Sequence, residues 1–177
     1  MGKKIKKVPK KILKKNVANS SQKKYLTIDP SGTGITGIFY SNQETKKIEF
    51  QEFQSKEWQE HCQFLINYLK KNPVDIIIYE TTNYINLMGR DMTSLFKLFG
   101  AIESLKYSFP QVQEVKSIFV SAVKQLYRQV YKKEKKIQDL NYKAGRGGGW
   151  TYQNNKLTSH TLDAFLIYQK EINSKNN

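Results

Sequence analysis

The chain has 177 residues, of which 38% are apolar and 12% aromatic, so it can bury the core of one domain and is not a disordered polymer. Its formal net charge is +15, from 30 Lys and Arg against 15 Asp and Glu. The Lys-, Asn- and Ile-rich usage of a low-GC genome explains part of this surplus, and the remainder favours a polyanionic partner: nucleic acid, an anionic membrane surface or another polyanion. One cysteine excludes an internal disulfide, and no apolar run approaches the roughly 20 residues of a membrane span. With no signal-peptide pattern either, we expect a cytoplasmic protein with no membrane association.

Residues 1–23 are predicted to be a flexible basic arm. Residues 1–24 hold ten lysines and no acid, together with Pro9 and the polar exit NVANSSQ. Such a segment adds non-specific phosphate contacts that weaken as salt rises. A helix lying on a membrane is the weaker interpretation, because its apolar face would be thin.

The next segments predict three strands, a helix and a fourth strand. The strands cover 24–29, 34–41 and 46–53, and their short links suggest an antiparallel meander. Residues 55–72 have apolar side chains at helical spacing, with His61 expected on the exposed side. VDIIIYE, residues 74–80, is a continuous β-branched run, typical of a central strand covered on both faces.

The second half alternates helices and strands. Helices are predicted over 90–109, 122–140 and 159–172, a fifth strand over 112–120, and a loop over 141–156. The order β-β-β-α-β-α-β-α-α predicts an α/β domain. Its sheet would be five-stranded and mixed, three strands antiparallel and the rest parallel, with helices on both faces.

Carboxylates stand at the ends of two predicted strands. Asp29 ends the first strand and Glu80 the fourth, and these strands are expected to be parallel neighbours. His160 and Asp163, three residues apart, share one face of the last helix. Carboxylates crowded together repel one another unless a divalent cation neutralises them, and oxygen ligands with one imidazole suit Mg²⁺ or Mn²⁺ better than Zn²⁺. Two such ions ~3.5–4 Å apart can hydrolyse a phosphodiester.

Simpler explanations exist for each of these residues. Asp29 could shape the turn before Pro30, and Glu80 could be a solvated strand end. Asp163 and His160 could be ordinary residues near a helix N-terminus. The glycines that follow Asp29 could cradle a phosphate, but the carboxylate would repel that ligand, which favours the metal interpretation.

Three segments in order, IDPSGTGITGI, VDIIIYE and SHTLDAFLI, resemble the RuvC branch of the RNase H-like superfamily, the Holliday-junction resolvases. The resemblance runs over residues 24–172 and implies an RNase H-like nuclease domain over 24–177. The metal ligands and catalytic residues that it implies are Asp29, Glu80, His160 and Asp163. His160 stands where many relatives carry Asp, so its role as ligand or in proton transfer is open, as is the choice between Mg²⁺ and Mn²⁺. Ser31, inserted before Gly32, departs from the family pattern and predicts a rearranged turn.

The resemblance also implies a homodimer whose two sites cut opposing strands of a four-way DNA junction. The segment LFKLFGAIESL occupies the position of the family's dimerisation helix. Tyr84 is the aromatic residue nearest to the position that probes the junction centre in that family.

The segment GRGGGW has the composition of a nucleic-acid contact. Its glycines let backbone approach phosphate, Lys143 and Arg146 supply charge, and Trp150 can stack on an unpaired base. Alternatively, Trp150 plugs the core. The residues expected to contact DNA are Tyr84, Arg90, Lys116, Lys124, Lys143, Arg146 and Trp150.

The favoured function is a metal-dependent, structure-specific DNA endonuclease that resolves four-way junctions with two Mg²⁺ or Mn²⁺ ions per site. A nuclease of the same fold acting on flaps, forks or RNA, or a nucleic-acid-binding protein with an idle site, are the alternatives. An actin-like or sugar-kinase-like ATPase needs a second similar domain, for which the chain is too short.

Overall fold

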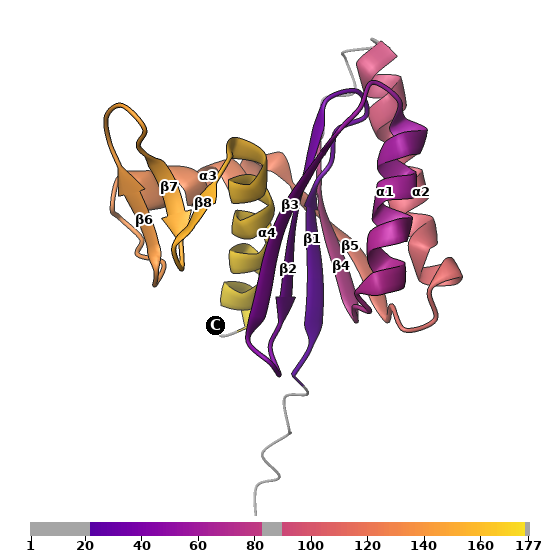
Figure 1. Ribbon diagram of the computed structural model, residues 1–177, viewed down its shortest axis with the longest axis horizontal. Coiled ribbons are helices and arrows are strands. Elements are labelled where there is room, and N and C mark those ends of the chain that lie inside the picture. Colours follow the sequence, from indigo (N-terminus) through magenta and orange to yellow (C-terminus); the bar gives the residue numbers. More distant parts are fainter. Residues whose placement is uncertain (1–21, 83–89, 176–177) are drawn as a thin grey trace, which may run out of the picture.

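The computed structural model describes residues 22–82 and 90–175, and in these ranges a central sheet is flanked by helices and by a second, small sheet (Figure 1). In chain order the elements are β1 (Lys24–Asp29), β2 (Ile35–Asn42), β3 (Lys47–Gln54), α1 (Trp58–Lys71), β4 (Ile76–Thr81), α2 (Arg90–Ser108), β5 (Glu114–Phe119), α3 (Val120–Tyr131), β6 (Leu140–Lys143), β7 (Gly149–Tyr152), β8 (Asn155–Leu157) and α4 (Ser159–Lys175).

The central sheet has five strands in the order β3-β2-β1-β4-β5. The β1–β2 and β2–β3 pairs are antiparallel, whereas the β1–β4 and β4–β5 pairs are parallel. The predicted mixed α/β sheet is therefore confirmed, including the parallel contact between the first and fourth strands.

Each face of this sheet has its own apolar core because side chains alternate along a strand. Leu26 and Ile28 of β1 point to the face covered by α1 and α2. Tyr25 of β1 and Phe39 of β2 point to the opposite face, which is covered by α3, α4 and the small sheet. Figure 1 shows these two layers on either side of the strands. As predicted, the central strands are covered on both faces.

Residues 141–156 were expected to be a loop, but they form most of a second sheet, so this prediction was wrong. Strands β6, β7 and β8 pair antiparallel in that order. Gln153 and Asn154 form the two-residue turn between β7 and β8, with φ of 45° and 67°. Positive φ at both central positions is the geometry of a tight hairpin turn. The strands are so short that the glycines around them hid the alternating pattern.

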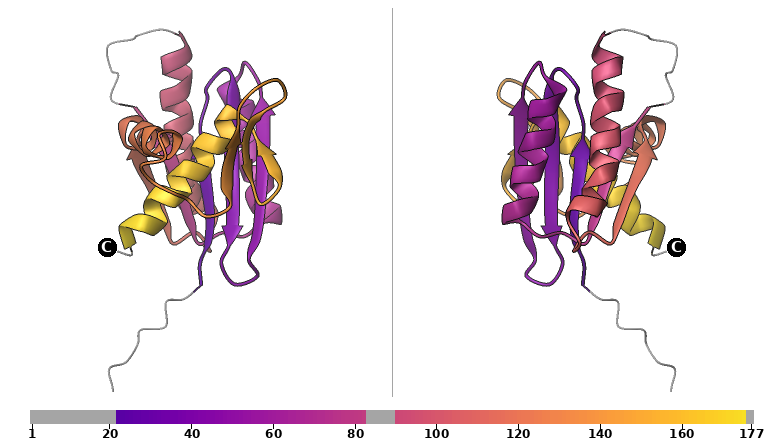
Figure 2. Two further views of the ribbon diagram at one scale, coloured as in Figure 1. Left: turned by 90° about the vertical axis from the view of Figure 1, so that its left-hand side faces the viewer. Right: turned by 90° about the vertical axis from the view of Figure 1, so that its right-hand side faces the viewer.

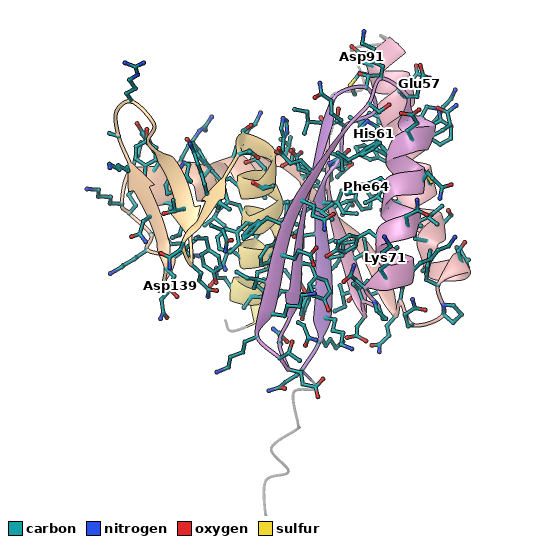
Figure 3. The ribbon with its side chains drawn as sticks, in the orientation of Figure 1. Glu57, His61, Phe64, Lys71, Asp91 and Asp139 are labelled. Atoms are coloured by element: carbon teal, nitrogen blue, oxygen red, sulfur yellow. The ribbon has the colours of Figure 1, made fainter. Side chains whose placement is uncertain are left out.

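Two further expectations change. Helix α3 ends at Tyr131 rather than continuing to 140, and Lys133 beyond it has φ of 62°, which no α-helix accommodates. His61, expected at the surface, is fully buried. Figure 3 shows it directed from α1 toward the sheet, beside Phe64.

No helix in residues 22–82 and 90–175 is long and apolar enough to cross a membrane. The basic arm predicted over residues 1–23 falls almost wholly outside the described residues, and stays a prediction.

Candidate active site

The register of the central sheet brings Asp29 and Glu80 to the same face. Ile28 of β1 pairs with Tyr79 of β4, and Asp29 and Glu80 are the next residue on each strand. Ile28 and Tyr79 both point to the α1–α2 core. Because direction alternates along a strand, the two carboxylates point to the other face, toward α4.

Helix α4 crosses this face diagonally (Figure 2). It is fixed to β1 by a hydrogen bond from Thr27 Oγ1 to the Ala164 carbonyl, 2.6 Å long, and to β2 by very close packing. A Cβ atom on Gly37 would lie 2.4 Å from the His160 carbonyl oxygen, so only glycine lets α4 approach here. In this position His160 Nδ1 lies 2.9 Å from Asp29 Oδ2.

The four predicted catalytic residues lie close enough for their charges to act on one another's pKa or to be acted on. Burial, and then repulsion from Asp29 and Asp163, raises the pKa of Glu80 to about 8, against a smaller opposing effect of Lys124. Burial followed by repulsion from Asp29 raises the pKa of Asp163 to about 6, and His160 and Lys124 oppose this shift. The structure thus brings together the carboxylates that the sequence pattern singled out.

The Asp29–His160 pair stabilises a charged imidazole. Burial raises the pKa of Asp29, and the hydrogen bond from His160 works against that rise. The same hydrogen bond is the main cause of the raised pKa of His160, which burial opposes. His160 therefore keeps a proton more readily than an ordinary histidine and partly balances the negative charge of the site.

Sequence reasoning missed Glu52, a fourth carboxylate. Asp29 pairs with Gly37 on β2, and Gly37 pairs with Glu52 on β3, so Asp29 and Glu52 share one row of the sheet. The negative charge of Glu52 raises the pKa of both Asp29 and His160. Thr158, just before α4, donates its hydroxyl to Glu52 Oε1. The alternation in KKIEFQEF already placed Glu52 on one face of its strand, but nothing in the sequence identified which face.

The turn after Asp29 packs against helix α2 and is tied to α1. A Cβ atom on Gly32 would lie 2.4 Å from the Leu95 backbone nitrogen, so this glycine serves the close approach of α2. Ser31 donates its backbone N–H to Thr36 Oγ1 at 3.0 Å. Thr36 Oγ1 lies 2.8 Å from His61 Nδ1, and His61 Nε2 lies 3.1 Å from the Ser55 carbonyl. The turn that contains Ser31 is therefore held by a buried histidine, and its rearrangement relative to the family pattern stays a prediction.

The donor types of the site suit a divalent metal ion, although they are not gathered as a ready set of ligands. Within the described residues, no three His, Cys, Asp or Glu side chains form a group that could hold a metal ion as they stand. However, the charge of Asp29 raises the pKa of Glu80 and of Asp163, and Asp163 also raises that of Glu80, which is the unfavourable interaction that a hard cation relieves. The chemistry of the donors fits Mg²⁺ or Mn²⁺, and binding would require the carboxylates to draw together.

Two of the predicted DNA contacts lie outside the described part of the chain, namely Tyr84 and the side chain of Arg90. Lys124, on α3, is exposed and acts on the pKa of Glu80 and Asp163, so it lies at the edge of the site. Lys116 is differently placed. Its Nζ lies 2.6 Å from Glu171 Oε1 and 3.5 Å from Glu114 Oε1, so it serves an ion-pair cluster between β5 and α4.

The remaining three predicted contacts belong to the small sheet. Lys143 and Arg146 are exposed, at the end of β6 and in the turn that follows it. Trp150 on β7 is partly buried and packs against the core beneath α4, but its ring also meets Tyr142 at 5.0 Å. Trp150 therefore contributes to the core, as one of its two interpretations predicted, and its stacking on an unpaired base stays a prediction.

No family model matches this chain, and no curated protein sequence matches it. Solved structures do. RuvC of Thermus thermophilus, solved in complex with a Holliday junction substrate, aligns with a TM-score of 0.60 and 13% identity over 86% of this chain and 95% of that one. A second T. thermophilus RuvC structure gives a TM-score of 0.59 with the same identity and coverage. This chain has the RNase H-like fold of RuvC. The yeast mitochondrial Holliday junction resolvase Ydc2 aligns more weakly, with a TM-score of 0.49 over 84% of this chain and 13% identity.

Proposed function

We propose that this chain is a divalent-metal-dependent endonuclease that cuts four-way DNA junctions as a homodimer. The observation that carries the proposal is the meeting of Asp29, Glu80, His160 and Asp163 at one edge of the sheet, in a fold shared with a RuvC solved on a Holliday junction. The net charge of +15 suits a polyanionic substrate.

The side chains have distinct tasks in this proposal. Asp29, Glu80 and Asp163 would hold two Mg²⁺ or Mn²⁺ ions, which supply an activated water and charge stabilisation for the leaving oxygen. His160 orients Asp29 through its 2.9 Å hydrogen bond and holds a proton beside the site. Lys124 places a positive charge next to Glu80, where it can meet a phosphate of the substrate.

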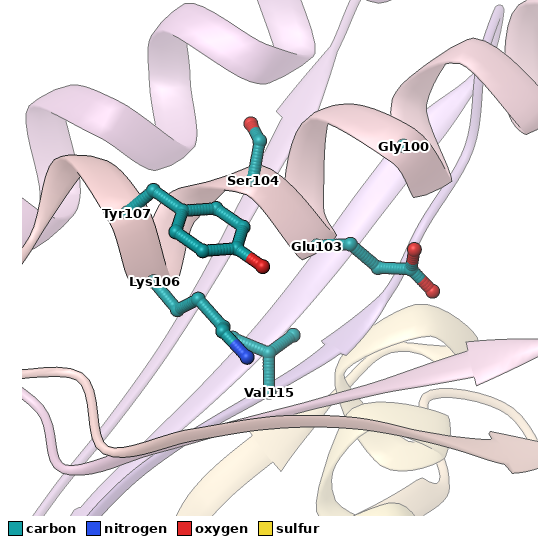
Figure 4. A pocket seen from close by; sticks show the side chains of 6 residues that line it. All are labelled: Gly100, Glu103, Ser104, Lys106, Tyr107 and Val115. Atoms are coloured by element: carbon teal, nitrogen blue, oxygen red, sulfur yellow. The ribbon is translucent and has the colours of Figure 1, made fainter.

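The homodimer is supported by two exposed aromatic residues on α2 and the open surface between them. Phe96 and Tyr107 are 43% and 80% exposed. Between them, a Cβ atom on Gly100 would meet no other atom within 4 Å. A pocket along this helix is lined by Gly100, Tyr107 and Val115 together with the polar side chains of Glu103, Ser104 and Lys106 (Figure 4). An open surface of this kind suits close packing against the same helix of a second copy.

The test is cleavage of a labelled four-way junction with Mg²⁺ or Mn²⁺, beside linear duplex, flap and RNA controls. Wild type is compared with Asp29→Asn, which keeps the side-chain shape and removes the charge. Paired, symmetric nicks in the junction, reduced at least about 100-fold in the variant while binding persists, are the expected result. Cutting of flaps or RNA instead of the junction would contradict the proposed substrate. Binding of the junction without cutting in either metal would contradict the proposal that this chain is a nuclease.

A further inference from the structure

The small sheet and α3 together carry an aromatic cluster, which consists of Tyr127, Tyr131, Tyr142 and Trp150. Tyr127 and Tyr131 of α3 stack with their ring planes at 13° and centroids 6.0 Å apart. Tyr131 contacts Tyr142 of β6 at 5.6 Å, and Tyr142 contacts Trp150 of β7 at 5.0 Å. The rings therefore form one continuous chain from the helix to the sheet.

The outer rings of this cluster are half exposed and border a hollow. Tyr131 is 53% exposed and Tyr142 is 50% exposed. With Trp150 they line a pocket of about 510 Å³ between the end of α3 and the small sheet. The pocket is large enough for a nucleobase and its sugar, and it offers aromatic surface that the fold itself leaves uncovered.

The rim of the same pocket is positively charged. Lys133, Lys135 and Lys136 line it, and no ion pair holds any of these three lysines within the part of the chain that the structure describes. The stretch 120–157, from α3 to β8, has nine Lys and Arg but only two Asp and Glu. Figure 3 shows one of those acids, Asp139, at the end of the small sheet. The pocket therefore suits an anionic ligand with flat apolar rings.

Unpaired nucleotides have this chemistry. In a duplex the base faces are covered by neighbouring bases, and a protein reaches only the edges and the phosphates. In a single strand the base faces are open to stack on Tyr or Trp, while Lys and Arg follow the phosphates.

The pocket is also within reach of the candidate active site. Lys124, which acts on the pKa of Glu80 and Asp163, lies on α3 seven residues before Tyr131. At 1.5 Å per residue this is about 10 Å along the helix axis, a span of a few nucleotides. Arg128, between them, is exposed.

We propose that the aromatic cluster and the three lysines form a binding site for unpaired nucleotides of DNA, with bases stacked on Tyr131 and Tyr142 and phosphates at Lys133, Lys135 and Lys136. The placement of this site beside the cutting centre rests on the proposed function, whereas single-strand binding itself does not.

The test uses the full chain in metal-free buffer with chelator, so that no cutting occurs. The chain has two tryptophans, and Trp58→Phe leaves Trp150 as the only one. In this background, an octamer of deoxythymidylate should quench Trp150 fluorescence. An abasic octamer with the same phosphates should bind about tenfold more weakly, because it cannot stack.

Tyr131→Leu with Tyr142→Leu should weaken octamer binding about tenfold and leave the affinity for the abasic strand and for a blunt duplex within twofold. Tyr107→Leu, 80% exposed on α2, is the matched control for the loss of an exposed tyrosine; it belongs to the proposed dimer contact, so it is compared in octamer binding alone, where it should leave the affinity within twofold. Urea unfolding checks that each variant is folded. Absence of quenching, equal binding of normal and abasic strands, or full affinity in the double variant would overturn the site.

Junction cleavage by the same proteins, with Mg²⁺ restored, separates the two proposals. Cutting without thymidylate binding would overturn the nucleotide site alone. Thymidylate binding without cutting of any substrate would overturn the nuclease and leave this site standing.

Discussion

The backbone of His160 lies directly on Gly37, where a Cβ atom would come within 2.4 Å of the His160 carbonyl oxygen. This contact sets how closely the first turn of α4 approaches the sheet, and with it the position of His160 against Asp29. A glycine in the middle of a strand is otherwise unfavourable, so its presence reflects the demand of the site.

Gly37→Ala should therefore damage both stability and activity. The added methyl group overpacks the α4 contact, at a cost of about 1–3 kcal/mol in the free energy of unfolding, and moves His160 away from Asp29. Urea unfolding and junction cleavage measure the two effects. Gly100→Ala is the control for stability alone, because Gly100 lies in a helix with open space around it within the chain, and the change should stabilise the chain by about 0.5–1 kcal/mol. Equal stability of both variants would show that the close contact carries no strain.

Stability should fall as pH rises across the neutral range. The folded pKa of Glu80 is raised from 4.5 to about 8, and that of Asp163 from 3.8 to about 6. The folded state therefore holds protons that the unfolded state has released, and the free energy of unfolding decreases through this window. The raised pKa values of Asp29 and His160 act with the same sign.

Thermal unfolding at pH 5 and pH 8 measures this effect. We expect at least about 2 kcal/mol less stability at pH 8, or about 4–8 °C in Tm, in the absence of metal. Mg²⁺ or Mn²⁺ should restore stability at pH 8 more than at pH 5, because protons compete with the ion for the same oxygens. Glu80→Gln should reduce the decrease in stability between pH 6 and pH 8. A metal effect that does not depend on pH would contradict binding at these carboxylates.

Lys116 and Lys124 were both predicted to contact DNA, and the structure separates them. Lys124→Gln should weaken junction binding severalfold without loss of stability, since this side chain is exposed at the edge of the site. Lys116→Gln should cost about 1–3 kcal/mol of stability, because it removes a partner of the buried Glu171 carboxylate, and should leave DNA affinity unchanged. Filter binding and urea unfolding of the pair provide the comparison. Equal losses of DNA affinity in the two variants would show that Lys116 contacts DNA as Lys124 does.

His61 should act on activity through the turn after Asp29. His61→Leu leaves the Thr36 hydroxyl and the Ser55 carbonyl without their ring partner, at a cost of about 1–3 kcal/mol. Loosening of the Ser31 turn should then lower kcat more than it raises KM. His61→Gln, which can keep one of the two hydrogen bonds, should recover part of both losses. If the His61→Leu protein were destabilised but kept its kcat, His61 would contribute to folding and not to activity.

Much of the fold follows from local patterns in the sequence. Hydrophobic runs with clear periods, such as VDIIIYE, specify β4, and the crossover through α1 makes β1 and β4 parallel neighbours. Asp29 and Glu80 could be found because each directly follows such a run. Their meeting with α4 could be expected only through the resemblance to a family, since nothing local positions a C-terminal helix.

The errors have a common physical cause. The strands β6–β8 have only three or four residues each, too few for a period to stand out among glycines. His61 is polar by composition, and its burial depends on partners from β2 and from the chain beyond β3. The position of Glu52 in the same row as Asp29 likewise depends on the register of two strand pairs. Long-range partners of this kind are not visible in a single sequence.

The pairing of β1 with β4 also bears on how such a protein can diverge. A shift of this register by one residue would turn Glu80 to the opposite face, away from Asp29 and α4. Insertions and deletions within these two strands would therefore be eliminated by selection. The strand register can thus keep Asp29 and Glu80 together in a fold that this chain shares with T. thermophilus RuvC at only 13% identity over 86% of this chain.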